Sequence, residues 1–147
     1  MKSLFISFLF LVLSHNAFAA CPDLEGRYVC ESSFGEVLKT YTQLPVGAYT
    51  EYKVISRLAG RNGEETDIFV TDNVLRQNGR YQVRSWCEDD KLWHFMFREW
   101  GNFRQTHKIM VFINRQGDLE KHDFAKFYRN GELDQSSVHK GSCRRVE

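Results

Sequence analysis

Apolar and β-branched residues recur along the chain in short runs rich in Val, Ile, Tyr, Phe and Thr, with polar turn residues and glycine between them. Runs of this kind are typical of β-strands, and the turn residues that separate them indicate hairpins. No segment shows a helical period of useful length. The pattern predicts strands at residues 26–33, 37–44, 48–59, 65–74, 80–88, 91–100, 103–114, 119–129 and 133–144. The segment with the least clear assignment is 34–48, where a short helix or an irregular lid could replace a strand.

The dipeptide Asn-Gly marks the sharpest turns, and it occurs at residues 62–63, 78–79 and 130–131. Both residues tolerate the positive φ that a two-residue type I′ hairpin turn requires. The flanking residues would then form favourable ionic and apolar pairs across the strands. These predicted pairs are Arg61–Glu64, Arg129–Glu132, Tyr128–Leu133 and Val74–Val83. Gly101-Asn102 and Gln116-Gly117 extend the same pattern less strictly.

Nine antiparallel strands in a chain of this size would curl and close, because closure removes sticky sheet edges. We therefore predict an all-β fold, an antiparallel up-and-down barrel of about eight to nine strands, with a β-sandwich as the alternative. Residues 92–97 and 109–113 are apolar on both faces of their predicted strands. This hairpin is expected to be covered on both sides by a second layer, a lid or a partner.

The first nineteen residues have the order of a secretory signal peptide, with Lys2, an uncharged apolar run at 4–13 and the small-x-small sequence Ala17-Phe18-Ala19. The predicted organisation is a cleaved signal peptide at 1–19 followed by one β-rich domain at 20–147. The protein is therefore expected to be exported, either to a periplasm or to the outside of the cell. An alternative is a lipoprotein signal, in which Cys21 would carry a lipid anchor, although such signals usually have Leu in place of Phe18.

Charge and cysteine content limit the possible partners. After removal of Lys2 with the signal peptide, 19 Lys and Arg residues balance 19 Asp and Glu residues, and no basic stripe indicates a nucleic-acid partner. No second apolar run approaches the length of a membrane span. An even number of cysteines in an oxidising compartment predicts two disulfides. The four residues are Cys21, Cys30, Cys87 and Cys143; three pairings are possible, with a slight preference for bonds that join the middle of the chain to its termini.

Motifs of enzymes and cofactor sites are absent from the sequence, which has no nucleophile elbow, zinc-protease motif, phosphate loop or dinucleotide fingerprint. We expect no catalytic residue, no metal site and no cofactor. The predicted turns at 101–102 and 116–117 place His94, His107 and His122 on one face, with His94 opposite Ile109 and His107 opposite Met96. Each of these two histidines then has an apolar neighbour and no second metal ligand.

The sequence Leu24-Glu25-Gly26-Arg27-Tyr28 resembles the opening of lipocalins, in which a Gly-x-Trp on the first strand closes a small barrel beneath an arginine of the last strand. Gly26 matches this motif, Tyr28 replaces the tryptophan, and Arg144 or Arg145 could supply the arginine. The resemblance covers about ten residues, and it implies a cup that holds an apolar ligand.

The leading functional hypothesis is an exported, non-catalytic binding protein that holds a small apolar or aromatic ligand in its barrel. The predicted ligand contacts are Trp93, Phe95, Met96, Ile109 and Val111. An inhibitor-like or envelope protein that binds a protein partner through the apolar hairpin is the alternative. The third hypothesis is a small exported hydrolase that uses histidines and carboxylates such as His94, His107, Asp67 or Asp72.

Overall fold

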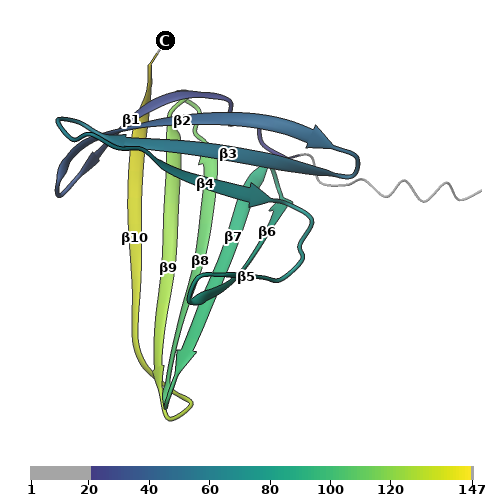
Figure 1. The fold of residues 1–147 in the computed structure, drawn as a ribbon, viewed down its shortest axis with the longest axis vertical. Coiled ribbons are helices and arrows are strands. Elements are labelled where there is room, and N and C mark those ends of the chain that lie inside the picture. Colours follow the sequence, from purple (N-terminus) through teal and green to yellow (C-terminus); the bar gives the residue numbers. More distant parts are fainter. Residues whose placement is uncertain (1–20, 147) are drawn as a thin grey trace, which may run out of the picture.

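The computed structural model describes residues 21–146, which form a single antiparallel sheet (Figure 1). Its strands are β1 (Gly26–Ser32), β2 (Gly35–Val46), β3 (Tyr49–Leu58), β4 (Glu65–Val70), β5 (Arg76–Asn78), β6 (Tyr81–Glu88), β7 (Lys91–Trp100), β8 (Phe103–Ile113), β9 (Leu119–Arg129) and β10 (Glu132–Val146). The predicted all-β, antiparallel class is confirmed. Segment 34–48, whose assignment was the least clear, is almost entirely the long strand β2.

Strand order in the sheet is β4-β3-β2-β1-β10-β9-β8-β7-β6-β5. Strands that follow one another in the chain are neighbours in the sheet, except for β4 and β5, which form its two edges. The first and last strands, β1 and β10, also pair with each other. The sheet is therefore open between β4 and β5, and the prediction of a closed barrel is wrong. The described chain also has ten strands where eight or nine were predicted, because the predicted strand at 65–74 ends at Val70 and a short strand follows it.

The sheet bends so that its two halves face each other. In Figure 1, β1–β4 lie across one end of the long strands β7–β10. We call β1–β4 the first arm and β6–β10 the second arm. Side chains from both arms meet in one core. Its fully buried members are Leu24, Tyr28, Tyr52, Leu92 and Leu119.

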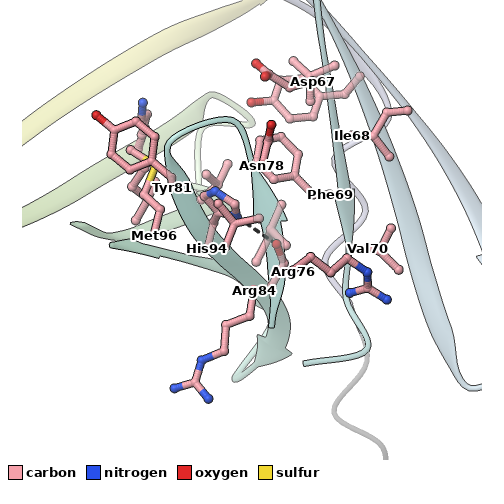
Figure 2. A pocket seen from close by; sticks show the side chains of 18 of the residues that line it. Asp67, Ile68, Phe69, Val70, Arg76, Asn78, Tyr81, Arg84, His94 and Met96 are labelled. Carbon is pink, nitrogen blue, oxygen red and sulfur yellow. Dashed lines mark hydrogen bonds between the residues drawn. The ribbon is translucent and has the colours of Figure 1, made fainter. Parts of the chain in front are cut away.

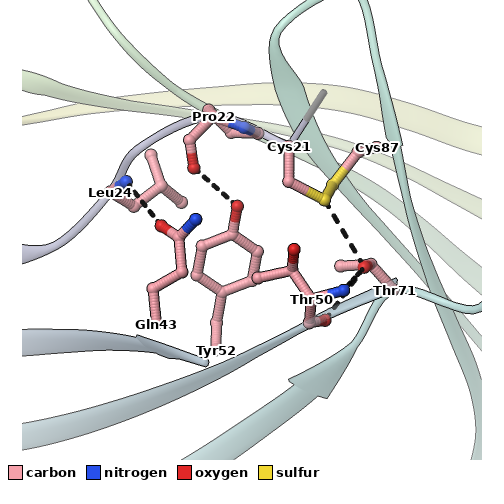
Figure 3. Close-up of a disulfide and its surroundings, with 8 residues drawn as sticks. All are labelled: Cys21, Pro22, Leu24, Gln43, Thr50, Tyr52, Thr71 and Cys87. Atoms are coloured by element: carbon pink, nitrogen blue, oxygen red, sulfur yellow. Dashed lines mark hydrogen bonds between the residues drawn. A yellow bond between two sulfur atoms is a disulfide. The ribbon is translucent and has the colours of Figure 1, made fainter. Parts of the chain in front are cut away.

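The segment before β1 closes one end of this core (Figure 3). The Tyr52 hydroxyl donates to the Pro22 carbonyl at 2.6 Å, and the Tyr28 hydroxyl donates to the Leu24 carbonyl at 3.1 Å. Burial raises the pKa of the Tyr52 phenol, so this hydroxyl remains a donor at neutral pH. The two buried tyrosines therefore attach the N-terminal segment to the first arm.

Two disulfides connect distant parts of the described chain, as predicted. Cys21 is bonded to Cys87 on β6, and Cys30 on β1 is bonded to Cys143, its direct cross-strand neighbour on β10. The first bond joins the N-terminal segment to the middle of the chain, and the second joins the two ends of the domain. Because the Cys21 sulfur is bonded to Cys87, it is not free to carry the thioether of a lipid anchor. The predicted signal peptide lies outside the described residues.

The turn at residues 130–131 is confirmed, because both Asn130 and Gly131 have positive φ and Arg129 lies opposite Glu132. The turn at 101–102 is confirmed as well, and it joins β7 directly to β8.

The other two Asn-Gly predictions are wrong. At 62–63 the pairing of β3 with β4 has already ended, and a tight turn forms earlier, where the Arg61 N–H donates to the Leu58 carbonyl at 3.2 Å. At 78–79 the turn is shifted by one residue, since only Gly79 of the two has a positive φ and Asn78 lies opposite Tyr81. Arg76 therefore faces Val83 in place of the predicted partner, Val74.

Hairpin β7–β8 is covered on one face only. Leu92 and Met96 point toward the first arm, whereas Trp93, Phe95 and Phe97 lie on the opposite face. No strand of the described chain packs over that opposite face. The described chain therefore supplies neither a second layer nor a lid there, and covering by a partner stays a prediction. The large aromatic rings on that face are half-buried.

Candidate functional site

The two arms enclose a cavity of about 470 Å³ on the concave side of the sheet (Figure 2). Figure 2 shows residues of β4 on one side of it and Tyr81 and Met96 on the other. Its volume lies within the range of about 300 to 1,000 Å³ that is usual for small-molecule sites. The apolar and aromatic part of the wall comes from both arms and consists of Tyr41, Val54, Ile68, Phe69, Val70, Tyr81, Val83, Leu92, Met96, Ile109 and Val111.

The cavity borders the open side of the sheet. Residues of both edge strands line it, with Ile68 and Phe69 on β4 and Arg76 and Asn78 on β5.

A hydrogen-bonded pair lies on the second arm inside the cavity. Ser85 Oγ is 2.8 Å from His94 Nδ1, and the rings of His94 and Phe69 pack in a T-shaped arrangement with their centres 4.8 Å apart. Burial is the main reason that the pKa of His94 is lowered to about 4; Asp67 opposes this shift and the charge of Lys121 favours it. His94 is therefore a neutral imidazole at neutral pH.

Two lysines reach the cavity from opposite arms, Lys39 on β2 and Lys121 on β9. Burial lowers the pKa of Lys39, and the charge of Lys121 lowers it further, while Asp67 and Glu65 act in the opposite direction. Neither lysine has a carboxylate within 4 Å among the described residues. Both can therefore donate hydrogen bonds to a ligand that carries an acceptor or an anionic group.

The predicted ligand contacts divide between the two faces of the second arm. Met96, Ile109 and Val111 line the cavity. Trp93 and Phe95 alternate with them and lie on the outer face, because successive strand residues point to opposite sides. The structure therefore brings three of the five residues together, and their role as ligand contacts remains a prediction.

The residues named for a hydrolase are also dispersed. His94 and Asp67 line the cavity, whereas the Asp72 carboxylate is bound by the Arg76 guanidinium, which holds the pKa of Asp72 at about 2. Ser85 and His94 have the spacing of a nucleophile and its base. However, Ser85 is only 3% exposed, and no carboxylate in the described part of the chain is hydrogen-bonded to His94.

His107 has a polar partner that the strand register predicted from the turn at 116–117 did not place beside it. Its Nδ1 lies 3.0 Å from both carboxylate oxygens of Asp123, and its Nε2 lies 2.9 Å from the Gln105 amide. The turn at 116–117 is part of a five-residue loop, so β9 is shifted by one residue and His122 lies opposite Met110. The prediction that His122 shares a face with His94 and His107 is wrong for this reason, and the same shift brings Asp123 to the face of His107.

Asn114 produces this shift, since it closes the five-residue loop. Its side-chain oxygen accepts from the N–H groups of Gln116 and Asp118, at 2.9 and 3.0 Å. The main-chain groups of Asn114 also bond Gly117 and Asp118. Side chains of Asn commonly fix turns in this way, so Asn114 was the available signal in the sequence.

Residues of the segment 24–28 meet Arg145 at the end of the core. The Arg145 guanidinium lies 5.9 Å from the centre of the Tyr28 ring and donates to the Glu25 carbonyl at 2.9 Å. A Cβ at Gly26 would lie 3.2 Å from two Arg145 nitrogens, and Gly26 has a φ of 149°. This position therefore favours glycine for both space and backbone conformation.

Comparisons of the chain with protein-family models, with curated proteins and with solved structures give no match. Between residues 21 and 146, no three His, Cys, Asp or Glu side chains lie together as a metal site would need. That part of the chain also has no helix of the length and apolarity that crossing a bilayer takes.

Proposed function

We propose that this protein is an exported, non-catalytic binding protein that holds one small, mainly apolar or aromatic ligand in the cavity between its arms. The observation that carries the proposal is the cavity itself, whose wall combines apolar and aromatic side chains of both arms with polar and charged groups. The polar groups include Ser85, His94, two lysines and the carboxylates of Glu65 and Asp67. Sites for small molecules have this composition, since apolar contacts supply affinity and a few polar groups fix orientation. The two disulfides support an oxidising compartment, either a periplasm or the cell exterior.

The polar groups suggest the character of the ligand. Ser85 and the neutral His94 can exchange hydrogen bonds, and the ammonium groups of Lys39 and Lys121 can bind a carboxylate or sulfonate. Anilinonaphthalene sulfonate has an aromatic body with one anionic group and is therefore a suitable probe. It is expected to bind with saturable one-to-one stoichiometry.

A pair of tryptophan substitutions tests the proposal. Met96→Trp adds bulk inside the cavity, whereas Phe95→Trp adds bulk on the outer face of the same strand. We expect Met96→Trp to weaken probe binding at least tenfold and Phe95→Trp to leave it unchanged, with both variants folded. Equal effects of the two substitutions, or a probe signal that never saturates, would contradict the proposal.

A lipocalin-like architecture is part of this proposal. The contact of Arg145 with Gly26 and Tyr28 supports it, because the arginine comes from the last strand as the resemblance requires. Two features depart from the family pattern, namely the ten strands and the open side between β4 and β5. In this proposal the open side serves as the entrance for the ligand.

A further inference from the structure

The outer face of the second arm carries rows of aromatic and basic side chains. The strand register aligns three adjacent rows across β6–β10, each with one residue from every strand. The rows are Gln82-Phe97-Thr106-Lys126-Ser136, Arg84-Phe95-Lys108-Phe124-Val138 and Trp86-Trp93-Met110-His122-Lys140. We call these fifteen residues the aromatic–basic face. At normal strand spacings its backbone covers about 19 Å by 14 Å.

Cations lie directly on aromatic rings within this face. The rings of Trp86 and Trp93 stack with centres 6.2 Å apart, and Lys108 Nζ lies 4.3 Å from the centre of Trp93. The Arg84 guanidinium lies 5.3 Å from Trp86 and 5.6 Å from Phe95. These contacts keep basic groups at the surface while the rings beneath them stay half-buried.

The charged residues of this face are all basic. The face contains four exposed cations and no carboxylate, although acidic and basic residues balance over the chain after residue 20. The four cations are Arg84, Lys108, Lys126 and Lys140. None of them has a carboxylate within 4 Å among residues 21–146. The two adjacent rows carry three carboxylates, and each has another partner. Glu99 is bound by Arg104, Glu88 accepts from the Trp86 indole at 3.3 Å, and Glu120 accepts from the Asn114 amide at 3.0 Å.

We propose that the aromatic–basic face docks onto the surface of an anionic lipid bilayer. Three of the four cations on this face are lysines, which are depleted at protein–protein interfaces. Lysine and arginine interspersed with Trp and Phe are instead the composition of surfaces that lie on anionic membranes. Exposed Val138, between Lys126 and Lys140, adds an apolar side chain at the rim.

Co-sedimentation with vesicles tests this proposal. The protein should bind vesicles that contain phosphatidylglycerol, bind pure phosphatidylcholine vesicles much less, and dissociate as salt increases. Lys126→Glu with Lys140→Glu should weaken binding at least about 25-fold, because each lysine contributes about fivefold or more. The matched control is Lys53→Glu with Arg61→Glu, which changes net charge equally at exposed positions of the first arm and its loop. The control should retain most of the binding.

Tryptophan emission locates the docking surface. In a Trp100→Phe background only Trp86 and Trp93 emit, and both should become protected from acrylamide in the presence of anionic vesicles. Retained binding of anilinonaphthalene sulfonate by every variant shows that the fold and the cavity are intact. Equal binding to both kinds of vesicle, or an equal loss in the control, would overturn the proposal. Binding to soluble polyglutamate without binding to vesicles would also overturn it, in favour of an acidic protein partner.

Discussion

Acid should destabilise this protein through His94 before most of its carboxylates titrate. The pKa of His94 is lowered to about 4 in the folded protein because the ring is buried against Ser85 and Phe69 near Lys121, whereas the unfolded value is 6.5. Between these two values the unfolded chain binds a proton that the folded chain does not. The contribution of the neutral His94 to the free energy of unfolding is therefore fully present above pH 6.5. Below that pH it falls by about 1.4 kcal/mol per pH unit, and about 3 kcal/mol is lost at pH 4.

Urea unfolding curves from pH 7.5 to 4, recorded on the wild type and on His94→Gln, measure this effect. Glutamine can still bond Ser85 but does not titrate, so the variant should lack most of the decrease between pH 6.5 and 4.5. His139→Gln provides the control, because it makes the same substitution at an exposed histidine outside the cavity. If the wild type and His94→Gln lose stability in parallel over this range, His94 is not buried as the structure places it.

Three further predictions concern the framework around the cavity. Replacing Cys30 and Cys143 with alanine opens a loop of 113 residues and should lower the free energy of unfolding by about 5 kcal/mol; a loss under 1 kcal/mol in urea titration would contradict this. Gly26→Ala should cost about 1 to 3 kcal/mol because of its backbone conformation and its contact with a guanidinium, and an unchanged midpoint of thermal unfolding would argue against that contact. A double-mutant cycle of His107→Gln and Asp123→Asn should give a coupling free energy of about 0.5 to 3 kcal/mol, and strictly additive effects would show that the pair is not formed.

Local turn chemistry explains which parts of the fold were predictable. Residues 130–131 were predicted correctly because the preference for positive φ and the Arg129–Glu132 pair support the same register. At 114–118 the two-residue interpretation failed, because Asn114 fixes a longer loop through bonds to main-chain groups that no pattern of apolar residues reveals. An error of one residue in register moves a whole strand to the other face.

The cavity was much harder to predict, because its walls come from strands far apart in the chain. Met96, Ile109 and Val111 were expected from one apolar hairpin, and the structure places them on the cavity wall. Lys39 and Lys121 carry no local signal, since they become neighbours only when the sheet bends and the first arm crosses the second. The open side between β4 and β5 likewise depends on the whole course of the chain and not on either edge strand alone.

The two methionines beyond the signal region allow a direct test of the central proposal. Met96 lines the cavity and Met110 lies on the aromatic–basic face, so each reports on one side of the same hairpin. In protein labelled with ¹³C at the methionine methyl groups, titration with anilinonaphthalene sulfonate should shift the Met96 resonance in a saturable way and leave Met110 unchanged. A shift confined to Met110, or no shift at either methyl group, would contradict a ligand site between the two arms.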